Sequence, residues 1–273
     1  MRFIGLDLAW SDRNNTAASV LELSRKDSAV LVHYQERLQG DAEIIEYILS
    51  MSQALLSSKG ATDGQGGACV AIDAPLIVRN KEGARPVDRE ITRRFGRYGA
   101  GAHPCNLEKF PQGVRGERLM KGLSRHGFLH QPFIDRLPRR KGMKTVFEVY
   151  PHPAQVILFG LSKRILYKKG GVETRRRGLV VLQDNIRAHL LRLEPRLRPS
   201  PLLSRLLNRN TDLLKGRELK CYEDALDSLI CAYIGLYHWY WGEERSEVVG
   251  DMESGYIVIP RSDFGRTGQG KTI

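Results

Sequence analysis

The stretch "CYEDALDSLICAYIG" (residues 221–235) combines an apolar helical pattern with two carboxylates, Asp224 and Asp227. Spacings of three and four residues place both acids on one stripe of a helix that we expect over about 220–238. That stripe continues with the small residues Ser228, Cys231 and Gly235, and the opposite stripe is bulky: Leu226, Leu229, Ile230, Tyr233 and Tyr237. The simplest alternative is a solvated first helical turn, where acids suit the helix dipole. Small residues let a helix approach a sheet closely, so we favour an acidic stripe that faces inward.

Apolar segments elsewhere in the chain supply strands for that sheet. The segments "RFIGLDLAW" (2–10), "ACVAIDAPL" (68–76) and "KTVFEVYPHP" (144–153) are strand patterns in which an acidic residue follows the apolar run: Asp7, Asp73 and Glu148. Two further strand patterns, 15–24 and 28–38, are joined by a connection short enough for a hairpin, and "GYIVIP" (255–260) is expected to form a last short strand. Helical patterns cover 41–57, 153–160, 173–193 and 201–208.

Connection lengths then predict the fold class. Hairpins join antiparallel strands, whereas a crossover through a helix joins parallel ones. We therefore expect an α/β fold with a mixed five-stranded sheet, three antiparallel strands followed by parallel ones, flanked by helices. Residues 1–273 are expected to form a single domain. Residues 79–143 are rich in Arg, Gly and Pro, and we expect them to form a basic helical insertion between the fourth and fifth strands, with helices near 86–97 and 115–125 and no strand.

Composition and charge limit the class of protein. Apolar residues make up 41% of the chain, which is enough for a core, but no run reaches the roughly 18 apolar residues of a membrane span. Asp7 interrupts the N-terminal apolar run, and the four cysteines form no CxxC pair, so we expect a cytoplasmic protein with reduced thiols and no membrane partner. Residues 79–220 hold 33 of the 43 Lys and Arg residues but only 12 of the 31 acids, which favours a polyanionic partner such as nucleic acid.

The acids suggest a chemistry. Asp7, Asp73 and Glu148 end strands that we expect to be parallel, and ligands of open α/β sheets bind at that edge. Several inward carboxylates repel one another and lose hydration, so they need cations, and oxygen-only ligands favour Mg²⁺ or Mn²⁺ over zinc. Two such ions about 3.5–4 Å apart can promote an in-line phosphoryl displacement. The candidate catalytic residues are Asp7, Asp73, Glu148, Asp224 and Asp227.

Several motifs in order carry a family resemblance. "GLDLAW" (5–10), "AIDAPL" (71–76), "EVYPHP" (148–153), "EDALDSLICAYIG" (223–235) and "GYIVIP", with "RPVDRE" (85–90) and "YKK" (167–169), resemble the predicted RNase H-like nucleases of domain-of-unknown-function family 429. The resemblance spans about residues 2–260 and implies an RNase H-like fold and nuclease activity. More distantly, the pattern resembles Holliday-junction resolvases, which implies metal ligands at Asp7, Asp73, Asp224 and Asp227. Asp73 stands where those resolvases have glutamate, and Glu148, part of the nearer family's pattern, is an alternative to one of the helix aspartates.

Substrate contacts are harder to select in so basic a chain. The candidates are Arg85, Arg89, Arg93, Lys144 and His152. His126 with His130, His103, and the aromatic run 239–241 are weaker candidates, for which ordinary surface or core roles are expected. We predict a metal-dependent nuclease acting on DNA or RNA. The alternatives are a non-catalytic nucleic-acid-binding protein of the same fold and, lower in rank because a DxGxGT-type loop is missing, an actin-like or sugar-kinase phosphotransferase.

Overall fold

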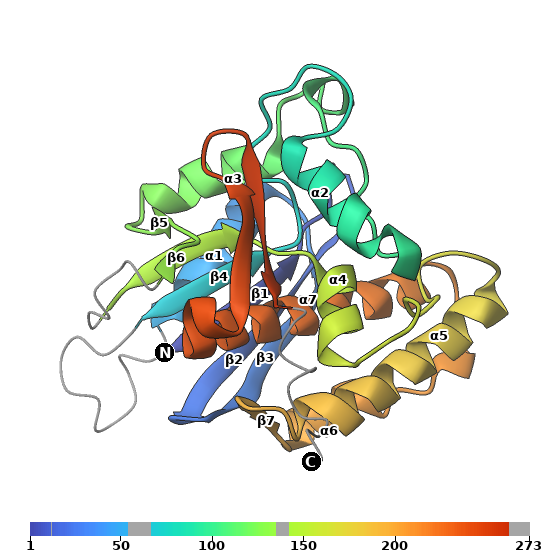
Figure 1. The fold of residues 1–273 in the computed structure, drawn as a ribbon. Coiled ribbons are helices and arrows are strands. Elements are labelled where there is room, and N and C mark those ends of the chain that lie inside the picture. The colour runs from blue at the N-terminus through green and yellow to red at the C-terminus, as the bar shows by residue number, and fades with distance from the viewer. Residues whose placement is uncertain (12, 54–66, 135–141, 262–273) are drawn as a thin grey trace, which may run out of the picture.

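The main feature of the fold is a seven-stranded mixed sheet with the strand order β5-β6-β4-β1-β2-β3-β7. A computed structural model describes residues 1–273 except 12, 54–66, 135–141 and 262–273 (Figure 1). The strands of this sheet are β1 (Arg2–Asp7), β2 (Thr16–Arg25), β3 (Ser28–Leu38), β4 (Ala68–Ile72), β5 (Leu129–His130), β6 (Lys144–Glu148) and β7 (Arg196–Arg198). A mixed α/β fold with a helix-flanked sheet is therefore confirmed.

The five expected strands are adjacent members of this sheet, but the predicted number of strands is wrong. β1, β2 and β3 pair antiparallel, and β4 and β6 run parallel to β1. β5 and β7 extend the two edges by parallel pairing with β6 and β3. β5 lies inside the segment 79–143, which was expected to contain no strand. Strands of two and three residues are too short for alternation to show in a sequence.

Helices cover both faces of the sheet. They are α1 (Asp41–Gln53), α2 (Pro86–Phe95), α3 (Arg115–Ser124), α4 (Pro151–Leu158), α5 (Val172–Asn185), α6 (Pro201–Leu207) and α7 (Gly216–Trp241), with short helical turns η1 (Gly96–Tyr98), η2 (Leu107–Lys109), η4 (Ile186–Leu190), η5 (Thr211–Leu213) and η6 (Gly242–Glu244). Apolar residues of α1 and α3 pack with one face of the sheet, and those of α4, α5, α6 and α7 pack with the other. Figure 1 shows α7 running across the sheet and α5 beside it.

Close contact between α7 and β1 depends on small residues, as expected from the small side chains that share a stripe with the acids of α7. A Cβ added to Gly5 would lie 2.1 Å from Ala232 N and from Ser228 O, so only glycine allows this approach. The Oγ atoms of Ser19 and Ser228 are 2.7 Å apart, and Gly235 lies over β4. Every residue of α7 from Cys221 to His238 is buried, because the bulky stripe on its other side packs against the outer helices.

The predicted strand 255–260 is confirmed as β9 (Gly255–Pro260), but it pairs in a separate two-stranded sheet with β8 (Ser246–Asp251), which the sequence reading missed. A single bridge between Val149 and Val258 joins it to the end of β6. β8, β9, α2 and α4 share a small apolar core, and Figure 1 shows the hairpin beside α2.

The last turn of the helix predicted over 41–57 lies outside the described ranges. In the part of the chain that the structure describes, no helix combines the length and the hydropathy needed to span a bilayer.

Candidate active site

Two of the predicted acids meet at the ends of neighbouring parallel strands. β1 and β4 pair in register from Arg2 with Ala68 to Leu6 with Ile72, so Asp7 and Asp73 occupy the next matching positions. The amide of Asp73 donates a 2.9 Å hydrogen bond to Leu6 O, which continues the ladder to this edge. Side chains alternate along a strand, and Phe3 on the same side of β1 packs in the core that contains α7. Asp7 and Asp73 therefore face the acidic stripe of α7.

Glu148 ends its strand one position out of phase with these two acids. Ile72 pairs with Glu148, so the residue that matches Asp73 on β6 is Val149, whose amide bonds Ile72 O at 2.9 Å. Phe147 and Val149 lie in the core on the α7 side of the sheet. Alternation hence turns Glu148 away from α7 and toward the segment that follows β4.

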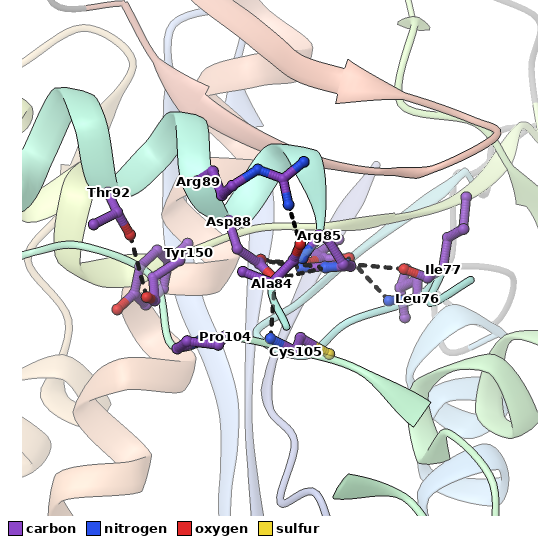
Figure 2. A network of polar contacts seen from close by, with 12 residues as sticks. Leu76, Ile77, Ala84, Arg85, Asp88, Arg89, Thr92, Pro104, Cys105 and Tyr150 are labelled. Atoms are coloured by element: carbon purple, nitrogen blue, oxygen red, sulfur yellow. Dashed lines mark hydrogen bonds and ion pairs between the residues drawn. The ribbon is translucent and has the colours of Figure 1, made fainter. Parts of the chain in front are cut away.

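Glu148 instead binds a buried arginine. Arg85 donates two hydrogen bonds to the Glu148 carboxylate, at 2.7 and 3.0 Å, and also pairs with Asp88 at 2.9 Å. The amide of Leu76 donates to Glu148 at 2.9 Å, and Arg85 also donates to Ile77 O. Figure 2 shows Arg85 lying between Asp88 and the Leu76–Ile77 segment. We call Arg85, Asp88 and Glu148 the arginine clamp.

Asp224 lies close to Asp7, and the negative charges of the two carboxylates repel each other. Burial raises the pKa of Asp224 to about 9, and the neighbouring negative charge of Asp7 contributes to the rise. Lys220 offsets part of this effect, since its Nζ lies 2.5 Å from Asp224 Oδ1. The predicted helix start near 220 is wrong, because α7 begins at Gly216. Asp224 and Asp227 thus lie beyond the first turn, where the helix dipole gives them no support.

Asp227 is the most enclosed of the five acids, with no exposed surface. Tyr167 OH donates to its Oδ1 at 2.7 Å, and Lys168 Nζ lies 2.6 Å from its Oδ2. Gln155 Nε2 donates to Tyr167 OH at 2.8 Å, which fixes that hydroxyl in turn. The carboxylate of Asp227 is therefore bound by protein groups on both oxygens.

The acids line two cavities that share Asp7. The inner cavity, about 250 Å³, is lined by Asp7, Asp73, Glu148, His152 and Lys168, together with aromatic and backbone groups that include Trp10 and Tyr150. The outer cavity, about 590 Å³, is lined by Asp7, Asp224, Lys220, Arg13 and Arg217 with Asn14 and Asn15. Ala9 and Trp10 lie on both walls, so Asp7 stands at the boundary between a narrow pocket and a wider basic one.

The predicted substrate-binding residues are only partly brought together. Arg85 and His152 line the inner cavity. Arg89 donates to Ala84 O on the exposed side of α2, and Arg93 pairs with Glu90 at 2.6 Å. Lys144 begins β6, at the opposite end of the strand from Glu148, and lies over the Phe128 ring. These three residues do not line either cavity.

His152 is buried beside the acids. Burial lowers its pKa to about 3, and the nearby Lys168 adds to the fall. The imidazole is therefore neutral at physiological pH, and among the described residues its Nδ1 has no hydrogen-bond partner. It presents an uncharged, unsatisfied nitrogen to the cavity.

Other histidines and aromatics have structural partners. His130 bonds Tyr256 OH at 2.8 Å, and Lys144 Nζ lies 3.5 Å from His126 O. Trp239 packs edge-on against Phe3, and Trp241 donates to Glu194 O. These contacts agree with the surface and core roles expected for them.

The residue that sequence reasoning missed is Lys168, with Tyr167 behind it. The motif "YKK" was noted only as part of a resemblance, without a role. A basic group also surrounds His103, whose pKa is lowered by burial and then by the charges of Lys169, Lys109, Arg164 and Lys168. We call Lys109, Arg164, Lys168 and Lys169 the cationic rim. Proximity of "YKK" to the acidic stripe depends on tertiary packing, so spacing alone could not reveal it.

The donor set suits a hard divalent cation in chemistry but is not a ready-made metal site. Within the described residues, no group of three or more His, Cys, Asp or Glu side chains is placed to hold a metal ion. Asp7 Oδ2 is nevertheless buried without a hydrogen-bond partner among those residues. Burial raises the pKa of Asp73 well above its usual range, the charge of Lys168 counters this, and Asp7 adds to it. Asp7, Asp73 and Asp224 are therefore the acids that a cation would stabilise.

This arrangement of acids at the carboxyl edge of an α/β sheet defines a candidate functional site. A family model described as "Protein of unknown function (DUF429)" matches residues 7–253, so the chain belongs to the DUF429 family. Neither the curated proteins nor the solved structures that were searched gave a match.

Proposed function

We propose that the protein hydrolyses phosphodiester bonds in nucleic acids with the help of Mg²⁺ or Mn²⁺. The observation that carries the proposal is the cluster of Asp7, Asp73 and Asp224, of which Asp7 keeps an unpartnered buried oxygen and Asp224 a pKa near 9. Uncompensated buried carboxylates cost stability, and a chain tolerates that cost where a ligand removes it.

The sheet supports an RNase H-like interpretation of this site. Its five central strands, in the order β3-β2-β1-β4-β6, combine three antiparallel strands with two parallel ones, as connection lengths predicted. In this proposal β5 and β7 are additions at the edges. The same interpretation makes residues 79–143 an insertion that contributes His103, Arg85 and Asp88 to the cavity wall.

Each part of the site would have a separate task. Asp7, Asp73 and Asp224 would hold the cation, which supplies Lewis-acid polarisation of the phosphate when bound. The cationic rim and the outer-cavity residues Arg13 and Arg217 would bind phosphates on the two sides of the scissile bond. His152, kept neutral by burial, would contact the ligand as a hydrogen-bonding group. Asp7 lies between the two cavities, so the nucleotides on either side of a phosphodiester at Asp7 would each occupy one of them.

A specific observation also favours a second candidate, a nucleic-acid-binding protein without catalysis. Asp224 pairs with Lys220 and Asp227 pairs with Lys168, so each aspartate of α7 already has a lysine beside it. If these pairs persist in the presence of divalent cations, the basic residues would still bind phosphates, but the acids would activate nothing.

A cleavage assay separates the two candidates. Single- and double-stranded DNA, RNA, RNA–DNA hybrid and branched DNA should be incubated with the protein and with Mg²⁺ or Mn²⁺. We expect cleavage of at least one substrate, and a loss of about 10³-fold in rate for Asp7→Asn, since a charge that organises the transition state is removed. The exposed Asp212→Asn is the matched control and should retain full activity.

Two results would contradict the nuclease proposal. Cleavage that survives Asp7→Asn at full rate would exclude this site as the catalyst. Binding of the same oligonucleotides that weakens with salt, but without any cleavage, would instead favour the non-catalytic protein.

A further inference from the structure

The ion pair between Lys168 and Asp227 differs from the other lysine pairs in its surroundings. The side chain of Lys168 is 26% exposed and lines the inner cavity with Asp7 and Asp73, whereas its partner Asp227 is completely buried. Lys220, the other lysine at the acids, is 55% exposed and lies on the outer cavity. Lys168 therefore contacts the buried carboxylate of Asp227 and also lines the inner cavity.

The segment that carries Lys168 is held in place from two directions. Tyr167, with no exposed surface, bonds Asp227 through its hydroxyl, while Arg175 Nε donates to Tyr167 O at 3.4 Å. Gly178 of α5 packs directly on this segment, since a Cβ there would lie 2.1 Å from Leu166 O. These contacts hold a segment without regular secondary structure against α5 and α7, and they place the Lys168 ammonium group at the cavity wall.

The nearby carboxylates keep the ammonium group of Lys168 protonated. Burial by itself lowers the pKa of Lys168, but the charges of Asp227 and Asp7 outweigh it, so the pKa lies well above its usual range. Lys168 is therefore a permanent cation beside Asp7 and Asp73. Tyr167 donates to one oxygen of Asp227 and Lys168 forms an ion pair with the other, so a metal ion at Asp227 would compete with the lysine for Oδ2.

We infer that Lys168 is the resident cation of the site: it occupies the place of a second metal ion and binds a non-bridging oxygen of the substrate phosphate. Asp227 and Tyr167 are then positioning residues that anchor the lysine, and a divalent ion would have to draw Asp7, Asp73 and Asp224 together, since no such group is already placed to hold a metal within the described residues. This inference rests on the proposed function and revises the ligand set that the sequence suggested, in which Asp227 also held metal. The lysine remains protonated throughout, so its contribution is charge stabilisation alone.

Calorimetric titration with Mn²⁺ alone tests the ligand set without any substrate. We expect one Mn²⁺ per wild-type chain. Lys168→Gln, which keeps a polar side chain only slightly shorter than lysine and removes the charge, should bind that ion about fivefold more tightly or better, because a like charge beside Asp7 and Asp73 has gone. A wild-type stoichiometry of two, reduced to one by Asp227→Asn, would overturn the inference, and so would weaker binding by Lys168→Gln.

Kinetics test the phosphate contact. Lys168→Gln should lower kcat by about 10²–10³-fold at saturating Mn²⁺, and Lys168→Arg should restore a substantial part of it, because a preorganised charge acts on the transition state. A purely structural lysine would instead lower the melting temperature and leave the kcat of the folded fraction unchanged. The control is Lys26→Gln, an exposed lysine in the hairpin at the other end of the sheet, for which no change is expected.

The two proposals fail in different ways. If wild type cleaves no substrate, the nuclease proposal falls, and the Mn²⁺ stoichiometry with the Lys168→Gln affinity still decides whether a lysine replaces the second ion. If wild type cleaves and Lys168→Gln cleaves at the same rate, the nuclease proposal stands and the role of Lys168 is refuted.

Discussion

The arginine clamp and the Asp7–Asp224 pair are two buried acidic clusters at the same sheet edge, and they are neutralised in opposite ways. In the clamp, Arg85 makes bidentate contact with Glu148 and also binds Asp88, and its own side chain is only 3% exposed. At the pair, the cation is Lys220, whose side chain is mostly in solvent. The comparison teaches that burial of acids alone does not mark a functional site. An acid that is paired with an equally buried cation stabilises the fold. An acid whose negative charge is not balanced by a buried cation can still bind a cationic ligand.

The largest effect should follow from removing the buried cation of the clamp. Arg85→Met leaves Glu148 and Asp88 buried without their shared cation, and loss of one member of a buried ion pair costs about 3–5 kcal/mol in the free energy of unfolding. Urea denaturation followed by circular dichroism measures this loss. Arg93→Met, on the exposed side of α2, is the control and should change stability by less than about 0.5 kcal/mol. Equal stabilities for the two variants would mean that the clamp does not hold the segment after β4.

A smaller effect of opposite sign is expected at the other cluster. Asp7→Asn removes the charge that repels Asp224, so without metal the variant should be more stable than wild type by about 1–2 kcal/mol at pH 8. Thermal melting in chelator measures the gain, and it should disappear or reverse on addition of Mn²⁺, which stabilises only wild type. Asp212→Asn should melt like wild type in both conditions. A loss of stability in chelator for Asp7→Asn would show that Asp7 is a structural acid like Glu148.

The sequence predicted the sheet well and the site unevenly, for physical reasons. Strand alternation and connection lengths are local, so the five longer strands and their antiparallel or parallel directions followed from them, whereas β5 and β7 are too short to show a pattern. Asp7, Asp73 and Glu148 were all selected because each follows an apolar strand pattern. Glu148 ends its strand in the opposite phase, and only the register of β4 with β6 reveals this. The pairing of Arg85 with Glu148 spans 63 residues of chain, and that of Lys168 with Asp227 spans 59, beyond any local pattern.

The pH dependence of stability should distinguish the clusters further. The pKa of Asp224 rises to about 9 in the folded protein from an ordinary value of 3.8. Between these values the folded protein keeps a proton that the unfolded chain has released, so its stability falls as pH rises from about 4 to 9, by up to about 1.4 kcal/mol per pH unit. Asp224→Asn should flatten this slope. Urea midpoints measured in chelator at pH 5, 6, 7 and 8 provide the test, and an unchanged slope in the variant would mean that another group is responsible.

The smallest effect should come from the cation at the Asp7–Asp224 pair. Lys220 contacts Asp224 and Glu223, yet its side chain is 55% exposed, so solvent screens both interactions. Lys220→Gln should therefore cost less than about 1 kcal/mol in the free energy of unfolding, far below the loss expected for Arg85→Met. Glu223 keeps a second partner in Arg175, at 2.9 Å, and Asp224 is largely protonated at neutral pH, which leaves little for Lys220 to compensate. Urea denaturation beside Lys26→Gln measures the difference. A loss of about 3 kcal/mol or more would make Lys220 the counterpart of Arg85, and the contrast between a closed cluster and an open one would no longer hold.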